Sequence, residues 1–141
     1  MEPMRKNRDR LIPCLLLALV SLLALASCSK DDDDIPTPVI EYLVTYRLNV
    51  VSEVEVNEIT YLDSLGQTKV IAGDRNFNLT FRAVSGDRLS LGANGIITLG
   101  FASVNIEAFA PGKPVEVAVD EQGHPGPDPL AFDLEAELVL Q

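Results

Sequence analysis

The chain of 141 residues has no tryptophan, one histidine and two cysteines, and aromatic residues make up only 6% of it. A Ser–His–Asp triad would need His124 as its base, but His124 lies in a proline-rich stretch beside no candidate nucleophile, where we expect an exposed loop. One histidine, with no thiol after Cys28, argues against a zinc site. We therefore expect no catalytic residue, no metal and no cofactor, and a protein that is not an enzyme.

Basic residues are also scarce, since 11 Lys and Arg face 21 Asp and Glu and the net charge is −10. Binding to nucleic acid needs a basic face that neutralises phosphates, so no nucleic-acid partner is expected. The same charge argues against lying on anionic lipid. Two groups of carboxylates are closely spaced in the sequence. We interpret them as solvated edges of the domain and not as a paired acid/base site; they are Glu53, Glu55, Glu58, Asp133, Glu135 and Glu137.

The N-terminus has the pattern of a bacterial lipoprotein signal. A basic segment (residues 1–10) precedes a Leu- and Ala-rich segment (11–26) that is shorter than the roughly 20 residues of a spanning helix. Leu25-Ala26-Ser27-Cys28 then resembles a lipobox, in which small residues admit the peptidase and the cysteine thiol accepts the lipid. We expect residues 1–27 to be a cleaved signal peptide and Cys28 to anchor the protein in a membrane by its acyl chains.

Residues 28–38 are predicted to form a lipidated acidic tether. Four adjacent carboxylates repel one another and keep the segment extended, and two prolines end it. The run resembles the export signal of surface lipoproteins of the Bacteroidota, formed here by Ser29, Lys30, Asp31, Asp32, Asp33 and Asp34. We expect an outer-membrane protein exposed at the cell surface, with a periplasm-facing anchor as the alternative.

Residues 39–141 alternate apolar and polar side chains with a period of two, which predicts strands. We expect strands at residues 39–50, 54–62, 68–72, 77–83, 89–91, 96–109, 115–119 and 130–140. Turns are predicted at 63–66, 73–76, 85–87 and 111–112, a hairpin at Asn94-Gly95, a kink at Gly100 and a loop over 120–129. The prediction is an all-β fold, an antiparallel Ig-like β-sandwich of seven or eight strands, with a small β-barrel as the alternative.

Several short motifs follow one another along these strands. They are Val44-Thr45-Tyr46, Ile59-Thr60-Tyr61-Leu62-Asp63-Ser64-Leu65-Gly66, the apolar strand 79–83, and Gly86-Asp87-Arg88-Leu89-Ser90-Leu91. This order resembles the MmpS-like β-sandwich domain, a membrane-associated accessory to mycobacterial exporters. The resemblance implies a sandwich fold and an accessory role at a membrane. Asp63-Ser64-Leu65 also resembles the O-glycosylation motif of the Bacteroidota, which makes Ser64 a candidate for modification.

Two functional hypotheses remain open from the sequence. The first is a non-enzymatic interaction or accessory module, held on the membrane at Cys28 and acting on an envelope protein through a sheet edge or loop. The alternative is a surface lipoprotein that binds a glycan or Ca²⁺ through acidic loops that contain Asp120, Glu121 and Asp128.

Overall fold

The computed structural model describes residues 38–141, and these residues form an all-β fold. The six strands of one antiparallel sheet are β1 (Glu41–Leu62), β2 (Thr68–Ala72), β3 (Asn78–Val84), β4 (Arg88–Phe109), β5 (Glu116–His124) and β6 (Leu130–Val139). No helix is present in this part of the chain, so none there could cross a membrane. The prediction of an antiparallel all-β fold is confirmed for the described residues; the predicted signal peptide lies outside them.

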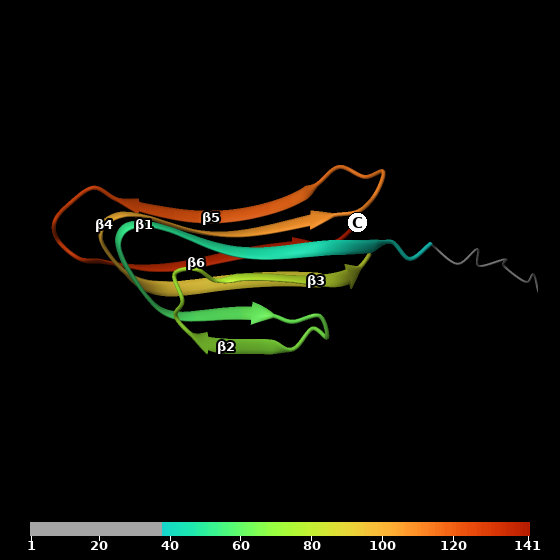
Figure 1. Ribbon diagram of the computed structural model, residues 1–141, viewed down its shortest axis with the longest axis horizontal. Coiled ribbons are helices and arrows are strands. Elements are labelled where there is room, and N and C mark those ends of the chain that lie inside the picture. The colour runs from blue at the N-terminus through green and yellow to red at the C-terminus, as the bar shows by residue number, and fades with distance from the viewer. Residues whose placement is uncertain (1–37) are drawn as a thin grey trace, which may run out of the picture. The chain divides into compact units, whose positions relative to one another are not determined.

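The two longest strands, β1 and β4, pair with each other over almost their whole lengths (Figure 1). β3 adds to the first part of β1 and β2 to its last part, while β6 adds to the first part of β4 and β5 to its last part. The sheet therefore has two halves that share β1 and β4. The first half-sheet has the order β3-β1-β4-β5, and the second half-sheet has the order β2-β1-β4-β6.

Both long strands bend where the two half-sheets meet. Ser52 and Gly100 lie opposite each other in the ladder, and both have left-handed backbone conformations, with φ of 69° and 119°. Two register shifts, at Glu53/Val54 and at Val56/Glu58, follow in β1, and such bulges bend and twist a strand. The positive φ of Gly100 confirms the predicted kink, and a Cβ there would lie 2.0 Å from the Val51 carbonyl oxygen.

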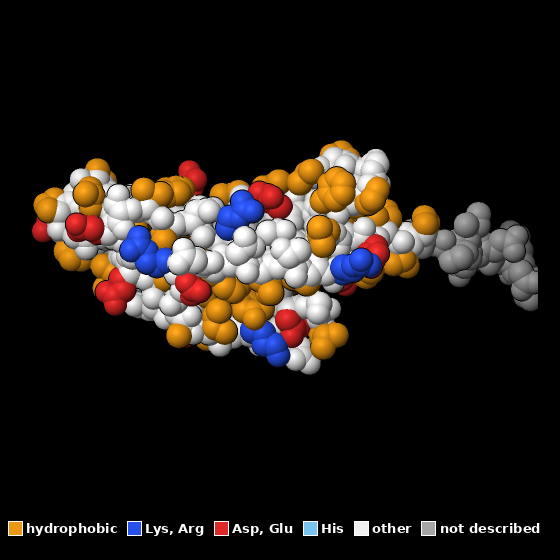
Figure 2. Space-filling view, in the orientation of Figure 1, with side chains coloured by type: hydrophobic (Ala, Val, Ile, Leu, Met, Phe, Trp, Pro, Cys, Tyr) orange, Lys and Arg blue, Asp and Glu red, His pale blue; other side chains and the backbone are white. Residues whose placement is uncertain are grey.

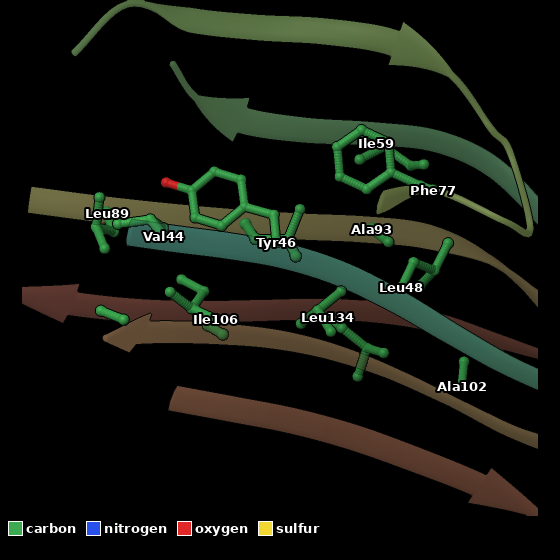
Figure 3. Packing of buried hydrophobic residues seen from close by; sticks show 14 of the residues in the cluster. Val44, Tyr46, Leu48, Ile59, Phe77, Leu89, Ala93, Ala102, Ile106 and Leu134 are labelled. Atoms are coloured by element: carbon green, nitrogen blue, oxygen red, sulfur yellow. The ribbon is translucent and has the colours of Figure 1, made fainter. Parts of the chain in front are cut away.

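The core is one cluster of buried side chains that come from both half-sheets. Its largest fully buried side chains come from β1 and β4, and these are Tyr42, Val44, Tyr46, Ile59, Leu89, Leu91, Ile97, Val104 and Ile106. Figure 3 shows Tyr46 among Val44, Leu89 and Ile106, with Ile59 and Phe77 beside the strands above it. The Tyr46 ring packs edge-on against Phe81 at 5.0 Å and Tyr61 at 6.2 Å between ring centroids. Tyr46 thus joins aromatic rings from both half-sheets.

Several local predictions are confirmed. The chain reverses at 63–66, 73–76, 85–87 and 111–112, and β2 has the predicted bounds. The last strand buries Phe132, Leu134 and Ala136 and exposes its acidic positions, as the sequence predicts, whereas Leu130 at its start is exposed.

The predicted count of seven or eight strands is wrong, because two predicted breaks are absent. Residues 39–50 and 54–62 belong to one bent strand, and β4 runs straight through Asn94-Gly95 without a hairpin. A Cβ at Gly95 would lie 2.0 Å from the Glu55 carbonyl oxygen and 2.7 Å from the Phe132 ring. Gly95 therefore lets neighbouring groups approach the backbone closely, and it does not form a turn.

The loop predicted for residues 120–129 is also shorter than expected. β5 continues to His124, which pairs with Gly100 across the ladder. Only residues 125–129 separate β5 from β6, so Asp120 and Glu121 are strand residues and not loop residues.

Candidate functional site

The predicted site residues fall into two groups. Cys28 and the acidic export segment (residues 29–34) lie outside the described residues, and their predicted roles stay predictions. Ser64 lies in the exposed turn between β1 and β2, which is the accessible position that modification would need.

The turn that carries Ser64 is built by the Asp63 side chain. One Asp63 carboxylate oxygen accepts hydrogen bonds from the backbone N–H groups of Leu65 and Gln67, both at 2.9 Å. Lys69 lies 3.4 Å from the other oxygen. The amide of Gln67 lowers the pKa of Asp63 most, and the Leu65 amide and the Lys69 ammonium act in the same direction. Gly66 closes the turn with a φ of 70°, a conformation that glycine adopts without strain.

A groove of about 390 Å³ lies between this turn and the strands β3 and β4. Leu65, Phe81 and Leu89 supply apolar surface, and Asp63, Asp87 and Arg88 supply charge. Leu65 lines the groove from the turn and is 78% exposed. A concave surface that offers apolar and charged side chains together can hold a side chain of a partner or a small ligand.

In β5 the apolar side chains face outward and the polar ones inward, which is the reverse of a typical amphipathic edge strand. Its valines, with Val115 just before it, point outward, whereas Glu116, Ala118 and Asp120 are half-buried. Together with neighbours on β1 and β4 the valines form an outer apolar patch on the first half-sheet. Its members, each 50–54% exposed, are Leu43, Phe109, Val115, Val117 and Val119.

The inward carboxylates of β5 join it to β6 and to the end of the chain. Asp120 accepts a hydrogen bond from the backbone N–H of Glu135 at 2.9 Å. Glu116 accepts one from the Tyr42 hydroxyl at 3.0 Å and a longer one from the backbone N–H of Gln141, beyond the end of β6, at 3.4 Å. β5 and β6 are both paired to β4, so these side chains close the seam between the edges of the two half-sheets. Inward charge on an edge strand also discourages a further strand from adding there.

The remaining candidates show no assembled chemistry. His124 ends β5 instead of lying in a loop as predicted, and its Nε2 lies 2.6 Å from the carbonyl oxygen of Asp128. Within residues 38–141 no three His, Cys, Asp or Glu side chains are placed to hold a metal ion. Asp133, Glu135 and Glu137 are exposed on β6, and Glu137 forms an ion pair with Arg88.

Sequence reasoning did not identify Glu116 and Asp120 as structural residues. Residues 115–120 alternate valine with other residues, and the usual assumption places valine inside. The one signal available was an acidic residue at each end of the alternate row, at Glu116 and Asp120. Comparison of the chain with models of known families, with curated proteins and with solved structures finds no match.

Proposed function

We propose that this chain is a lipid-anchored envelope protein whose folded part is a non-enzymatic interaction or accessory module. The groove beside the Asp63–Gly66 turn carries the interaction part of this proposal. It offers Leu65 and Phe81 for apolar contact and Asp87 and Arg88 for polar contact within one concave surface. The lipobox-like sequence before Cys28 supports the anchor.

We further propose that the two half-sheets are the layers of an Ig-like β-sandwich of the MmpS-like kind. The backbone N–H of Ser90 in the second half-sheet donates to the Tyr46 hydroxyl in the first, at 3.3 Å. The buried aromatic contact of Tyr46 with Tyr61 joins the same two layers. Both contacts support face-to-face packing of the kind found in sandwiches.

Protease treatment of intact cells tests the anchor and the location. Three proteins are compared: the unsubstituted chain, a Cys28→Ala variant, and a variant in which Asp31, Asp32, Asp33 and Asp34 are all alanine. For a surface protein we expect digestion of the unsubstituted chain, protection of the alanine-run variant, and loss of membrane association for Cys28→Ala. Protection of a membrane-bound unsubstituted chain would contradict surface exposure and favour the periplasm-facing alternative.

Site-specific crosslinking tests the interaction role of the groove. Residues 29–141 contain no cysteine, so Ser64→Cys would give the lipidated protein one free thiol beside the groove. Val51→Cys is the matched control, because Val51 is 55% exposed beside the bend of β1 and does not line the groove. We expect a heterologous adduct from Ser64→Cys and none from Val51→Cys. Recovery of only the monomer from both variants would contradict an interaction role.

A ligand-binding role is the second candidate, because the same groove has a volume within the range of small-molecule sites, about 300–1,000 Å³. A ligand that binds only the folded state raises the melting temperature. A panel of glycans and Ca²⁺ should then include at least one that raises the melting temperature, and Leu65→Asp should abolish that rise. An unchanged melting temperature across the panel would exclude this role for the compounds tested.

A further inference from the structure

The outer apolar patch is unusual because it faces away from the core of a small domain. Leu43 and Phe109 are direct partners in the β1–β4 ladder, and Val117 lies opposite Glu107 in the β4–β5 ladder. Val115 and Val119 flank Val117 on the same side of β5. Figure 2 shows hydrophobic side chains gathered over β5 and around the end of the sheet where β1 begins. Exposed patches of this kind mark surfaces that contact a partner or a membrane.

Charge is distributed unevenly between the outer faces of the two half-sheets. Beside the patch, Arg82 pairs with Glu41 at 3.0 Å, and Arg47 and Glu107 lie on the same face. Glu121 follows the valines in the exposed row of β5, so these groups together leave one net negative charge. On the outer face of β6, Asp133, Glu135 and Glu137 are exposed at alternate positions, and Arg88 offsets the charge of Glu137, so these groups leave two net negative charges. The patch thus lies on the face with the smaller net charge, and this is the face that an uncharged surface would contact more readily.

The chain also joins the sheet beside the patch. Leu43 is the third residue of β1, and its ladder partner Phe109 is the last residue of β4. Nine residues lie between Cys28 and Pro38, so the ten Cα–Cα steps from one to the other span at most about 36 Å when fully extended. A lipid on Cys28 would therefore hold the patch close to a bilayer and raise its effective concentration there.

We propose that the outer apolar patch rests on the bilayer that anchors the chain, in contact with the uncharged interfacial region of zwitterionic lipid. This inference rests on the proposed lipid anchor at Cys28. Phe109 and the valines enter the interface, while the acidic face of β6 stays in water. Contact through this patch fixes the orientation of the domain, and it accounts for the outward valines of β5 beside inward Glu116 and Asp120.

Tryptophan fluorescence can test this orientation without interference, since the chain has no tryptophan of its own. The full-length lipidated protein carries either Phe109→Trp or Val139→Trp, two positions that are 50% and 51% exposed on different faces. Each is reconstituted into phosphatidylcholine vesicles with and without brominated acyl chains, and flotation measures vesicle binding. We expect about twofold or greater quenching of Phe109→Trp, because an apolar face at the interface is buried about 5–10 Å into the boundary of headgroups and acyl chains, within reach of the bromines. Val139→Trp should keep its emission.

The outcomes separate this inference from the proposed anchor. Flotation with no quenching of Phe109→Trp, or with equal quenching at both positions, would overturn docking and leave the anchor intact. Loss of flotation would overturn the anchor and docking together. Val117→Asp, added to Phe109→Trp, should keep flotation and abolish the quenching; quenching that survives this change would also overturn docking through the patch.

Discussion

The buried Tyr46 hydroxyl should make the fold sensitive to alkaline pH. The Tyr46 side chain has no exposed surface, and burial raises its pKa from 10.0 to about 12, although the Ser90 amide opposes this shift. Because the folded-state pKa is above the unfolded one, the stabilising effect is complete below pH 10 and is lost as the pH rises through 12. A difference of two units at about 1.36 kcal/mol each makes the expected loss about 3 kcal/mol.

Urea unfolding at several pH values between 9 and 12 measures this loss, with strand circular dichroism as the signal. Tyr46→Phe should remove most of the alkaline loss, at a cost of about 1 kcal/mol near neutral pH, because the Ser90 amide then lacks its acceptor. Tyr61→Phe is the control, since it keeps the Tyr46 hydroxyl and should keep the loss. If Tyr46→Phe loses as much free energy of unfolding between pH 10 and 12 as the unsubstituted protein, burial of Tyr46 is not the cause.

Three further predictions concern the bend, the seam and the turn. Gly100→Ala should lower the free energy of unfolding by about 3 kcal/mol or more, because a Cβ would lie 2.0 Å from the Val51 carbonyl oxygen at a φ of 119°. Gly112→Ala is the control, because a Cβ at Gly112, where φ is 77°, would meet no atom within 4 Å; it should lower the free energy of unfolding by only about 1–2 kcal/mol. Equal losses for the two variants would contradict the claim that contact with Val51 destabilises Gly100→Ala. Asp120→Ala should cost about 1–2 kcal/mol and speed hydrogen exchange of the Glu135 amide, whereas Asp133→Ala should change stability by less than about 0.5 kcal/mol. Because the pKa of Asp63 is lowered from 3.8, its stabilisation of the turn should be complete above pH 3.8 and be lost as the pH falls from 3.8 through the lowered value. NMR shifts of the Leu65 and Gln67 amides would report this titration, and Asp63→Asn should abolish it.

The sequence predicts local structure well where side-chain chemistry acts locally. The Asp63 turn, the exposed acidic face of β6 and the kink at Gly100 all follow from turn residues, alternation and the special backbone of glycine. These features depend on neighbours within a few residues, so a pattern in the chain is sufficient to find them.

Predictions fail where a distant strand decides the outcome. Asn94-Gly95 has the composition of a hairpin turn, but pairing of β4 with β1 and β6 keeps it extended, and Phe132 occupies the space beside Gly95. The valines of β5 point outward because Glu116 and Asp120 find partners in Tyr42 and Glu135. The groove depends on strands distant in sequence, and alternation alone does not bring Leu65 beside Phe81.

The position of β1 inside the first half-sheet has a mechanical consequence. Residue 38 leads into a strand that is hydrogen-bonded to β3 on one side and to β4 on the other. A pull applied through residues before 38, roughly along the strand, would load both ladders in shear, so that many hydrogen bonds resist together. An edge strand pulled across its ladder would instead lose its hydrogen bonds one after another. A chain that is held from its N-terminus in this way is therefore held at a strand that two ladders secure.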